Sequence, residues 1–275
     1  MKKSRLRRHN LPTHIILTIL LVLLLYPLAM AVWGAFKNPN DFADTQWYPT
    51  LPLDFSSFIS AFKKLSPSIL NTIFVAGVGT AGVLFLSSIT AYAFARLKFP
   101  GKEFLYSLIL GLLMIPSILT LVPSFMTYKK ILGVNNYWIL ILPMWVGSPV
   151  GGVFLMRSFI EGIPEATFEA AKLDGANEFQ CYTKMCLPLC LPVLGTMTIN
   201  QFTSVWNDYM WPMITIRDEE LLTVSAMLFL KYNNNAGSYP AMYAGYLVTA
   251  LPLIVLFILT TKQYVEGLST SAIKM

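Results

Sequence analysis

Long apolar runs without charged residues dominate this sequence and decide what it can fold into. The first continues from Ile15 to Phe36, and further runs follow along the chain. A helix of about 20 apolar residues crosses a hydrocarbon core roughly 30 Å thick. Charged residues make up only 12% of the chain, about half their share in soluble domains. We therefore expect an all-α polytopic membrane protein with six transmembrane helices, at about 14–36, 68–95, 103–124, 137–157, 188–213 and 240–263.

Lysine and arginine are unevenly distributed between the two sides of this arrangement. With a cytoplasmic N-terminus, thirteen of the 20 Lys and Arg lie on the cytoplasmic side and seven on the other, which is the positive-inside asymmetry. Both termini are then cytoplasmic, with a basic N-terminus at 1–13 and a transmembrane permease domain at 14–275. The net charge of +6 therefore reflects topology and does not indicate nucleic-acid binding. The N-terminus also resembles a cleavable signal peptide, but its apolar run continues to Phe36, which favours an uncleaved first helix.

The segments between and within the spans add two expectations. The external segment 37–67 is rich in Pro, Asp and Trp, and we expect a short helix around Asp54 to Lys64. Prolines interrupt the third and fourth spans at Pro116, Pro123, Pro143 and Pro149. Backbone groups that proline frees inside a membrane are satisfied by neighbouring helices or a water-filled cavity. The pattern therefore predicts a packed bundle that forms a cavity.

Nucleotide and metal chemistry are not indicated. Gly77, Gly79 and Gly82 match the dinucleotide fingerprint, but they lie within the second span without the required strand. Small residues on a membrane helix more often allow another helix to approach closely. The chain has no phosphate-binding loop of the Gly-x4-Gly-Lys-Ser/Thr type, so we do not expect it to hydrolyse ATP. We expect no cofactor or metal, and free thiols in a reducing compartment at Cys181, Cys186 and Cys190.

The most polar long stretch, 164–188, lies in a predicted cytoplasmic loop, 158–187. Pro164 suits the first position of a helix, Glu165 places negative charge in the first turn, and Gly175 is a typical terminator. The resulting helix of about ten residues is too short to be stable alone in water. It therefore needs a surface on which to dock.

The side chains of this short helix fit such a contact. Ala170 and Ala171 allow close approach, and Glu165 and Glu169 offer charges one turn apart. A solvated surface loop is the alternative, with Glu169 and Lys172 paired weakly at i,i+3.

Several separated motifs resemble those of ABC importer permeases. Glu169-Ala-Ala, Gly175 and Leu187-Pro188 stand at the spacing of the family's EAA loop. Asp174, the stretch 91–102 and Trp206-Asn207-Asp208 resemble the carbohydrate-importer branch, specifically its shorter, maltose-permease-like subunit. Met185 replaces the Ile of many members, which is a conservative change. The resemblance covers essentially residues 14–275.

The resemblance implies a type I ABC importer permease in a bacterial or archaeal cytoplasmic membrane. Its implied partners are a second related permease, two ATP-binding-cassette ATPase subunits and an extracytoplasmic sugar-binding protein. The loop helix would fit a groove in one ATPase and pass on its closure. The implied ATPase-coupling residues are Glu165, Glu169, Ala170, Ala171, Asp174, Gly175, Leu187 and Pro188.

The fifth expected span carries polar residues that could line a sugar path. Polar groups within a membrane are costly and usually face protein or water, and amides, hydroxyls and aromatic faces suit a hydroxyl-rich sugar. Hydrogen bonding between permease subunits explains the same residues equally well. The candidates are Asn200, Ser204, Asn207, Asp208 and Trp211.

Two other function classes would require features that are not clear in this sequence. An ion-coupled secondary transporter would be expected to carry ionisable groups near the middle of the membrane and an inverted repeat, and neither is clear here. A membrane-embedded enzyme would need convergent His, Asp or Glu side chains, but both histidines are N-terminal and the acids lie mainly in loops. The sequence does not identify the transported sugar.

Overall fold

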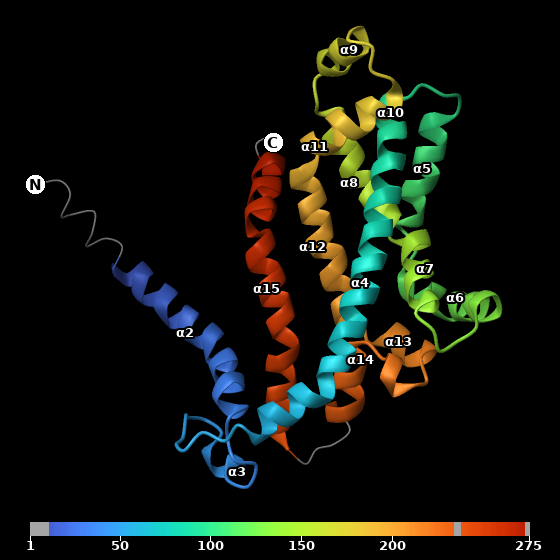
Figure 1. Cartoon of the computed structure of the whole chain (residues 1–275). Coiled ribbons are helices and arrows are strands. Elements are labelled where there is room, and N and C mark those ends of the chain that lie inside the picture. The colour runs from blue at the N-terminus through green and yellow to red at the C-terminus, as the bar shows by residue number, and fades with distance from the viewer. Residues whose placement is uncertain (1–10, 234–237, 273–275) are drawn as a thin grey trace, which may run out of the picture. The chain divides into compact units, whose positions relative to one another are not determined.

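The computed structural model describes residues 11–233 and 238–272, where every regular element is a helix (Figure 1). The chain divides into two compact units. Unit 1 comprises Met1–Ser66 and Leu228–Leu251, and unit 2 comprises Pro67–Met227 and Pro252–Met275. The basic N-terminus expected at 1–13 lies almost entirely outside the described residues.

Three described helices are long and apolar enough to cross a membrane: α2 (Leu11–Gly34), α4 (Ser56–Arg96) and α15 (Tyr239–Ala272). Three bent pairs raise the number of candidate spans to six. They are α5 (Lys102–Leu112) with α6 (Ser117–Leu132), α7 (Trp138–Gly147) with α8 (Pro149–Glu161), and the segment Glu178–Leu189 with α12 (Leu191–Asn207). The six expected spans are therefore each represented by one helix or one bent pair.

The second span differs from its prediction at the N-terminal end. The short external helix expected around Asp54 to Lys64 is not separate, because α4 continues through Pro67 without a break. Proline removes the hydrogen bond to the carbonyl four residues earlier, and here the Ser66 hydroxyl donates to that carbonyl, of Lys63, at 3.4 Å. A side-chain donor thus replaces part of the lost backbone bond.

Prolines mark the breaks in the third and fourth spans. Pro116 immediately precedes α6, which is bent by 96° from α5, and Pro149 opens α8, which is bent by 41° from α7. Pro143 and Pro123 instead lie inside α7 and α6. The 74° bend before α12 was not predicted from the sequence.

The remaining helices are short. They are α3 (Phe42–Thr45), α9 (Glu165–Leu173), α10 (Glu178–Gln180), η1 (Cys181–Cys186), α11 (Leu187–Leu189), α13 (Met210–Thr215), η2 (Glu219–Leu221), α14 (Val224–Leu228) and η3 (Phe229–Asn233).

Within unit 1, the segment after α2 folds back on that helix. The buried Lys37 ammonium donates to the carbonyls of Thr45 and Tyr48, and the Tyr26 hydroxyl donates to the Trp47 carbonyl at 2.7 Å. These bonds give the segment a defined conformation.

Within unit 2, the glycine motif of α4 serves helix packing. A Cβ atom on Gly82 would lie 2.0 Å from the Trp145 indole nitrogen, and that indole N–H lies 3.2 Å from the Gly79 carbonyl. The absence of side chains lets α7 approach the α4 backbone, which confirms the packing interpretation of this motif.

Candidate functional site

The polar loop carries a nine-residue helix, α9, which extends beyond the ends of α8 and α10 in unit 2 (Figure 1). The expected length was about ten residues. Pro164 differs slightly from its prediction, since it is the N-cap in an extended conformation and Glu165 is the first helical residue. Glu165 therefore stands in the first turn, where the helix dipole favours a carboxylate.

Gly175 ends α9 as predicted. Its φ of +86° lies in the left-handed region that favours glycine. The Gly175 N–H donates to the Lys172 carbonyl at 3.0 Å, and the Ala176 N–H donates to the Ala171 carbonyl at 2.9 Å. This pair of bonds is a Schellman motif, so the C-terminal end of α9 is fixed by its own backbone.

The two faces of α9 differ sharply. Phe168 is buried, whereas Leu173 is 88% exposed, and the exposed face also carries Glu165, Glu169 and Ala170. Ala171 is half-buried against the core, and Asp174 is the exposed C-cap. An exposed leucine beside two exposed carboxylates gives this face a mixed apolar and acidic character.

Lys172 does not pair with Glu169 as the sequence suggested. Its ammonium lies 2.5 Å from the Glu178 carboxylate, and this hydrogen bond raises the pKa of Lys172. Glu178 reaches Lys172 because Asn177 and Gln180 form a capping box that starts α10 beside α9. The Glu169 carboxylate stays on the exposed face.

Aromatic rings hold the buried face of α9. The Phe168 ring lies 6.4 Å from the Tyr92 ring of α4, and Tyr92 lies 5.4 Å from Tyr182 of η1, measured between centroids. The Tyr92 hydroxyl donates to Glu178 at 2.9 Å, and the hydroxyls of Tyr182 and Ser88 are 2.8 Å apart. These contacts anchor α9 to the end of α4.

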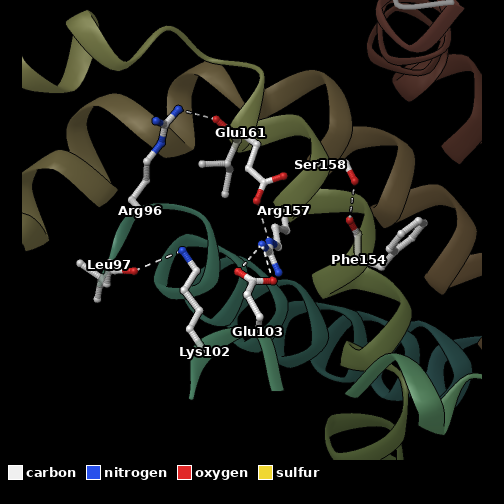
Figure 2. Close-up of polar contacts among 9 residues, drawn as sticks. Arg96, Leu97, Lys102, Glu103, Phe154, Arg157, Ser158 and Glu161 are labelled. Atoms are coloured by element: carbon white, nitrogen blue, oxygen red, sulfur yellow. Dashed lines mark hydrogen bonds and ion pairs between the residues drawn. The ribbon is translucent and has the colours of Figure 1, made fainter. Parts of the chain in front are cut away.

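Arg96, the last residue of α4, completes this anchor. Its guanidinium carbon lies 4.2 Å from the centroid of the Phe168 ring. Its terminal nitrogen Nη2 donates to the carbonyls of Ile160 and Ile163, at 2.6 and 2.5 Å. Figure 2 shows Arg96 reaching toward the end of α8.

A second arginine connects α5 to α8 nearby. Arg157 donates through Nη2 to Glu103 at 2.9 Å and through Nε to Glu161 at 2.7 Å (Figure 2). Its guanidinium carbon lies 3.9 Å from the centroid of Tyr106. The arginine side chain is only 10% exposed, whereas the Glu103 side chain is 69% exposed, so the contact is buried on one side only.

The other two predicted coupling residues lie away from the exposed face of α9. Leu187 and Pro188 follow η1, whose wider π-type turns place Cys181, Tyr182 and Cys186 in the core. Leu187 packs against that core, and Pro188 is exposed. The structure therefore gathers six of the eight residues on α9 and its C-terminal cap.

The predicted path residues fall into two groups. Asn200, Ser204 and Asn207 lie exposed along one face of α12. The helix ends at Asn207, so the continuous face expected through Asp208 to Trp211 is interrupted. Asp208 is instead an extended residue whose carboxylate accepts from the Trp211 backbone N–H at 3.3 Å.

Two of the candidates, one from each group, line different cavities. Asn200 lines one of about 260 Å³, and Trp211 lines another of about 590 Å³. Ser148, at the break between α7 and α8, lines both cavities and lies 3.4 Å from the Gln201 amide nitrogen. The larger cavity carries polar groups that the sequence did not single out, namely Ser117, Thr120, Ser124 and Tyr128.

The residues that hold α9 were also not predicted as site residues. Arg96 lies in the stretch 91–102 that carried the family resemblance, and Phe168 lies within the predicted helix. Their spacing along the chain gives no sign that they touch, because the contact joins elements about 70 residues apart. Only the fold brings them together.

Comparison with known proteins identifies the family. Residues 83–264 match the family described as "Binding-protein-dependent transport system inner membrane component". The chain belongs to this family. As a member, it is a multi-pass protein of the cytoplasmic membrane. Its role is that of a transport component, and the family's role is not itself catalytic.

Individual relatives cover most of the chain. It is 32% identical over 263 residues to the probable ABC transporter permease protein YurM of Bacillus subtilis (strain 168), covering 94% of this chain and 87% of the relative. It is 29% identical over 268 residues to the galactooligosaccharides transport system permease protein GanQ of the same organism, covering 95% and 94%. The arabinooligosaccharides transport system permease protein AraQ of Halalkalibacterium halodurans is 33% identical over 207 residues, covering 74% and 72%.

Solved structures show the same fold. The chain resembles a bacterial ABC transporter involved in the import of the acidic polysaccharide alginate, with a TM-score of 0.83 and 23% identity. The match covers 94% of this chain and 97% of the other. This likeness establishes the architecture of an ABC importer permease.

Proposed function

We propose that this chain is a permease subunit of an ABC importer that moves a sugar or oligosaccharide across the cytoplasmic membrane. The observation that carries the proposal is α9, a short helix with a buried Phe168 on one face and an 88% exposed Leu173 on the other. Because Phe168 packs on Tyr92 of α4 and anchors this helix within the chain, the exposed Leu173 side chain stays available for a contact outside the chain. Both features suit a docking partner.

The partner that docks on α9 is, in this proposal, an ATPase subunit that hydrolyses ATP. Two ATP-binding-cassette subunits would each receive a coupling helix, one from this chain and one from a second related permease. Burying a leucine fully contributes roughly 1.5–3 kcal/mol, so Leu173 supplies an apolar anchor. Glu165 and Glu169 then set the charge that the groove must complement.

The substrate class rests on the names of the relatives. The permeases AraQ, GanQ and MalD carry names for arabinooligosaccharides, galactooligosaccharides and maltodextrin. One structural neighbour is an alginate transporter in complex with an alginate pentasaccharide-bound periplasmic protein. These names support an oligosaccharide delivered by an extracytoplasmic binding protein.

The exposed polar face of α12 is the proposed path surface. Asn200, Ser204 and Asn207 are exposed within the isolated chain, and polar groups in a span face protein or water. Contact with the second permease explains the same exposure, so substitutions at these positions must be judged by transport specificity. A shift in sugar preference for Asn207→Ala in an assembled transporter supports the path, whereas unchanged preference and rate contradict it.

Ion-coupled transport is the weaker alternative. It requires ionisable groups that exchange ions within the span, and membership of a binding-protein-dependent family favours ATP coupling instead. Dependence of uptake on an ion gradient, with no effect of ATP inside the vesicle, would support this alternative.

Reconstitution tests the proposal directly. The full chain is purified with its second permease and ATPase subunits and placed in proteoliposomes with the sugar-binding protein. The proposal predicts sugar uptake that requires both internal ATP and the external binding protein. Uptake without ATP, or failure of the chain to bind any ATP-binding-cassette subunit, would contradict it.

A further inference from the structure

One guanidinium joins three helices at the end of unit 2 that carries α9. Arg96 ends α4, stacks on Phe168 of α9, and donates to the carbonyls of Ile160 and Ile163 at and beyond the end of α8. We propose that Arg96 is the positioning residue that transmits displacement of α9 to α4. The inference rests on the proposed function, since it presumes that α9 is moved by an ATPase.

The shape of arginine explains why this residue stands here. A guanidinium is planar, so its face can stack on a ring while the N–H groups at its edge donate hydrogen bonds. Arg96 does both at once, with the Phe168 ring 4.2 Å from its carbon and two carbonyls within 2.6 Å of Nη2. A lysine ammonium is a point charge on a flexible stem and cannot hold the same three elements together.

The contacts of Arg96 link α9 and the end of α8 directly to α4, as transmission of a displacement requires. Arg96 donates to the Ile160 and Ile163 carbonyls at and beyond the end of α8, while its own backbone belongs to α4. Tyr92, one turn earlier on α4, also faces Phe168. Because buried side chains pack closely and transmit strain, a shift of α9 carries Phe168 and presses on the last turn of α4.

Two simpler roles for Arg96 can be separated from transmission. The first is a positive charge that fixes topology, which any basic residue near this helix end supplies. Lys98 is exposed two residues further on, so Lys98→Gln removes one charge from the same place without touching the cluster. The second is a contribution to stability alone. Its loss would lower the amount of folded transporter and leave the coupling of that transporter unchanged.

The test uses the assembled transporter in proteoliposomes, with both permeases, the ATPase subunits and the sugar-binding protein. Arg96→Lys keeps the charge and Arg96→Gln removes it, and sugar uptake and ATP hydrolysis are measured on the same preparation. We expect both variants to assemble with their ATPase subunits. Sugar transported per ATP hydrolysed should fall by roughly fivefold or more, the lower range of typical coupling between sites.

A second variant tests the contact itself. Phe168→Leu should lower the same ratio, and combining it with Arg96→Lys should add little, because residues that act through one contact are not additive. Lys98→Gln should match wild type in transport per ATP.

Each outcome decides between the possibilities. If wild type transports and Arg96→Lys keeps the wild-type ratio, the inference is wrong and the proposed function stands. If the Arg96 variants lose transport only in proportion to folded, ATPase-bound complex, Arg96 is structural and the inference is also wrong. If wild type itself shows no ATP-dependent uptake, the proposed function fails first.

Discussion

The ammonium group of Lys172 pairs with the carboxylate of Glu178 at 2.5 Å, although Glu169 is the nearer partner in sequence. This pairing fastens α9 to the start of α10 and leaves the Glu169 carboxylate on the exposed face. The result separates the residues that hold α9 in place from those available to a partner.

Glu169→Lys should therefore impair coupling without unfolding the chain. The substitution reverses an exposed charge on the proposed docking face, whereas single exposed charges contribute little to stability. Binding-protein-stimulated ATP hydrolysis by the assembled transporter is the measurement, and it should fall. Lys184→Glu is the matched control, since it reverses an exposed charge of the same loop outside the α9 helix. Equal stimulation in Glu169→Lys and wild type would remove this residue from the docking face.

Gly175→Ala should loosen the end of α9. The added Cβ meets no atom within 4 Å, so the effect comes only from placing alanine at a φ of +86°, which costs roughly 1–2 kcal/mol. Gly175→Asn should cost less, because asparagine tolerates this conformation better. Amide hydrogen exchange across residues 164–176 measures the change. Equal protection in the alanine variant and wild type would show that the cap does not stabilise the helix.

Gly82→Leu should destabilise unit 2, because its side chain must displace the Trp145 indole from α4. Overpacking of this kind typically costs about 1–3 kcal/mol. Thermal unfolding in detergent is the measurement. Gly77→Ala provides the control within the same motif, since a Cβ there meets no atom within 4 Å. Alanine and leucine both favour a helix more than glycine does, so a loss in Gly82→Leu alone indicates packing. Wild-type stability of Gly82→Leu would contradict it.

The Arg157 cluster should respond unequally to loss of its partners. Glu103→Gln should lower stability by less than about 1 kcal/mol, because its side chain is 69% exposed and such pairs are weak. Arg157→Ala should cost more, since it also removes the packing of the arginine stem and guanidinium on Tyr106. Urea or thermal unfolding of the detergent-solubilised permease compares the two. A larger loss in Glu103→Gln would mean that leaving the buried guanidinium without this partner costs more than removing the arginine altogether.

Hydropathy and local helix signals were enough to predict the number of spans and the ends of α9. The apolar runs predicted six spans, and Glu165 and Gly175 bracketed α9 because first-turn acids and terminal glycines act within a few residues. Pro116 and Pro149 likewise marked the breaks in two spans. Local chemistry is readable wherever its cause and effect lie close together in sequence.

Contacts between distant segments could not be predicted in this way. The Arg96–Phe168 stack depends on how α4 and α9 meet. The pairing of Lys172 depends on the capping box that starts α10. The α4 helix also continues through Pro67, where the Ser66 hydroxyl donates to the Lys63 carbonyl. The candidate path residues also do not share one helix, because α12 ends at Asn207 and Trp211 belongs to the next helix.

Leu173 provides the most direct test of α9 as the docking helix. It is 88% exposed, so Leu173→Asp should leave the permease folded while placing a charge in the apolar contact, and Leu173→Met should preserve that contact. The measurement is the amount of ATPase subunit that co-purifies with the full-length permease from membranes. The proposal predicts near-complete loss of the ATPase for Leu173→Asp, with wild-type recovery for Leu173→Met. Full recovery of the ATPase and of sugar uptake with Leu173→Asp would contradict docking through α9.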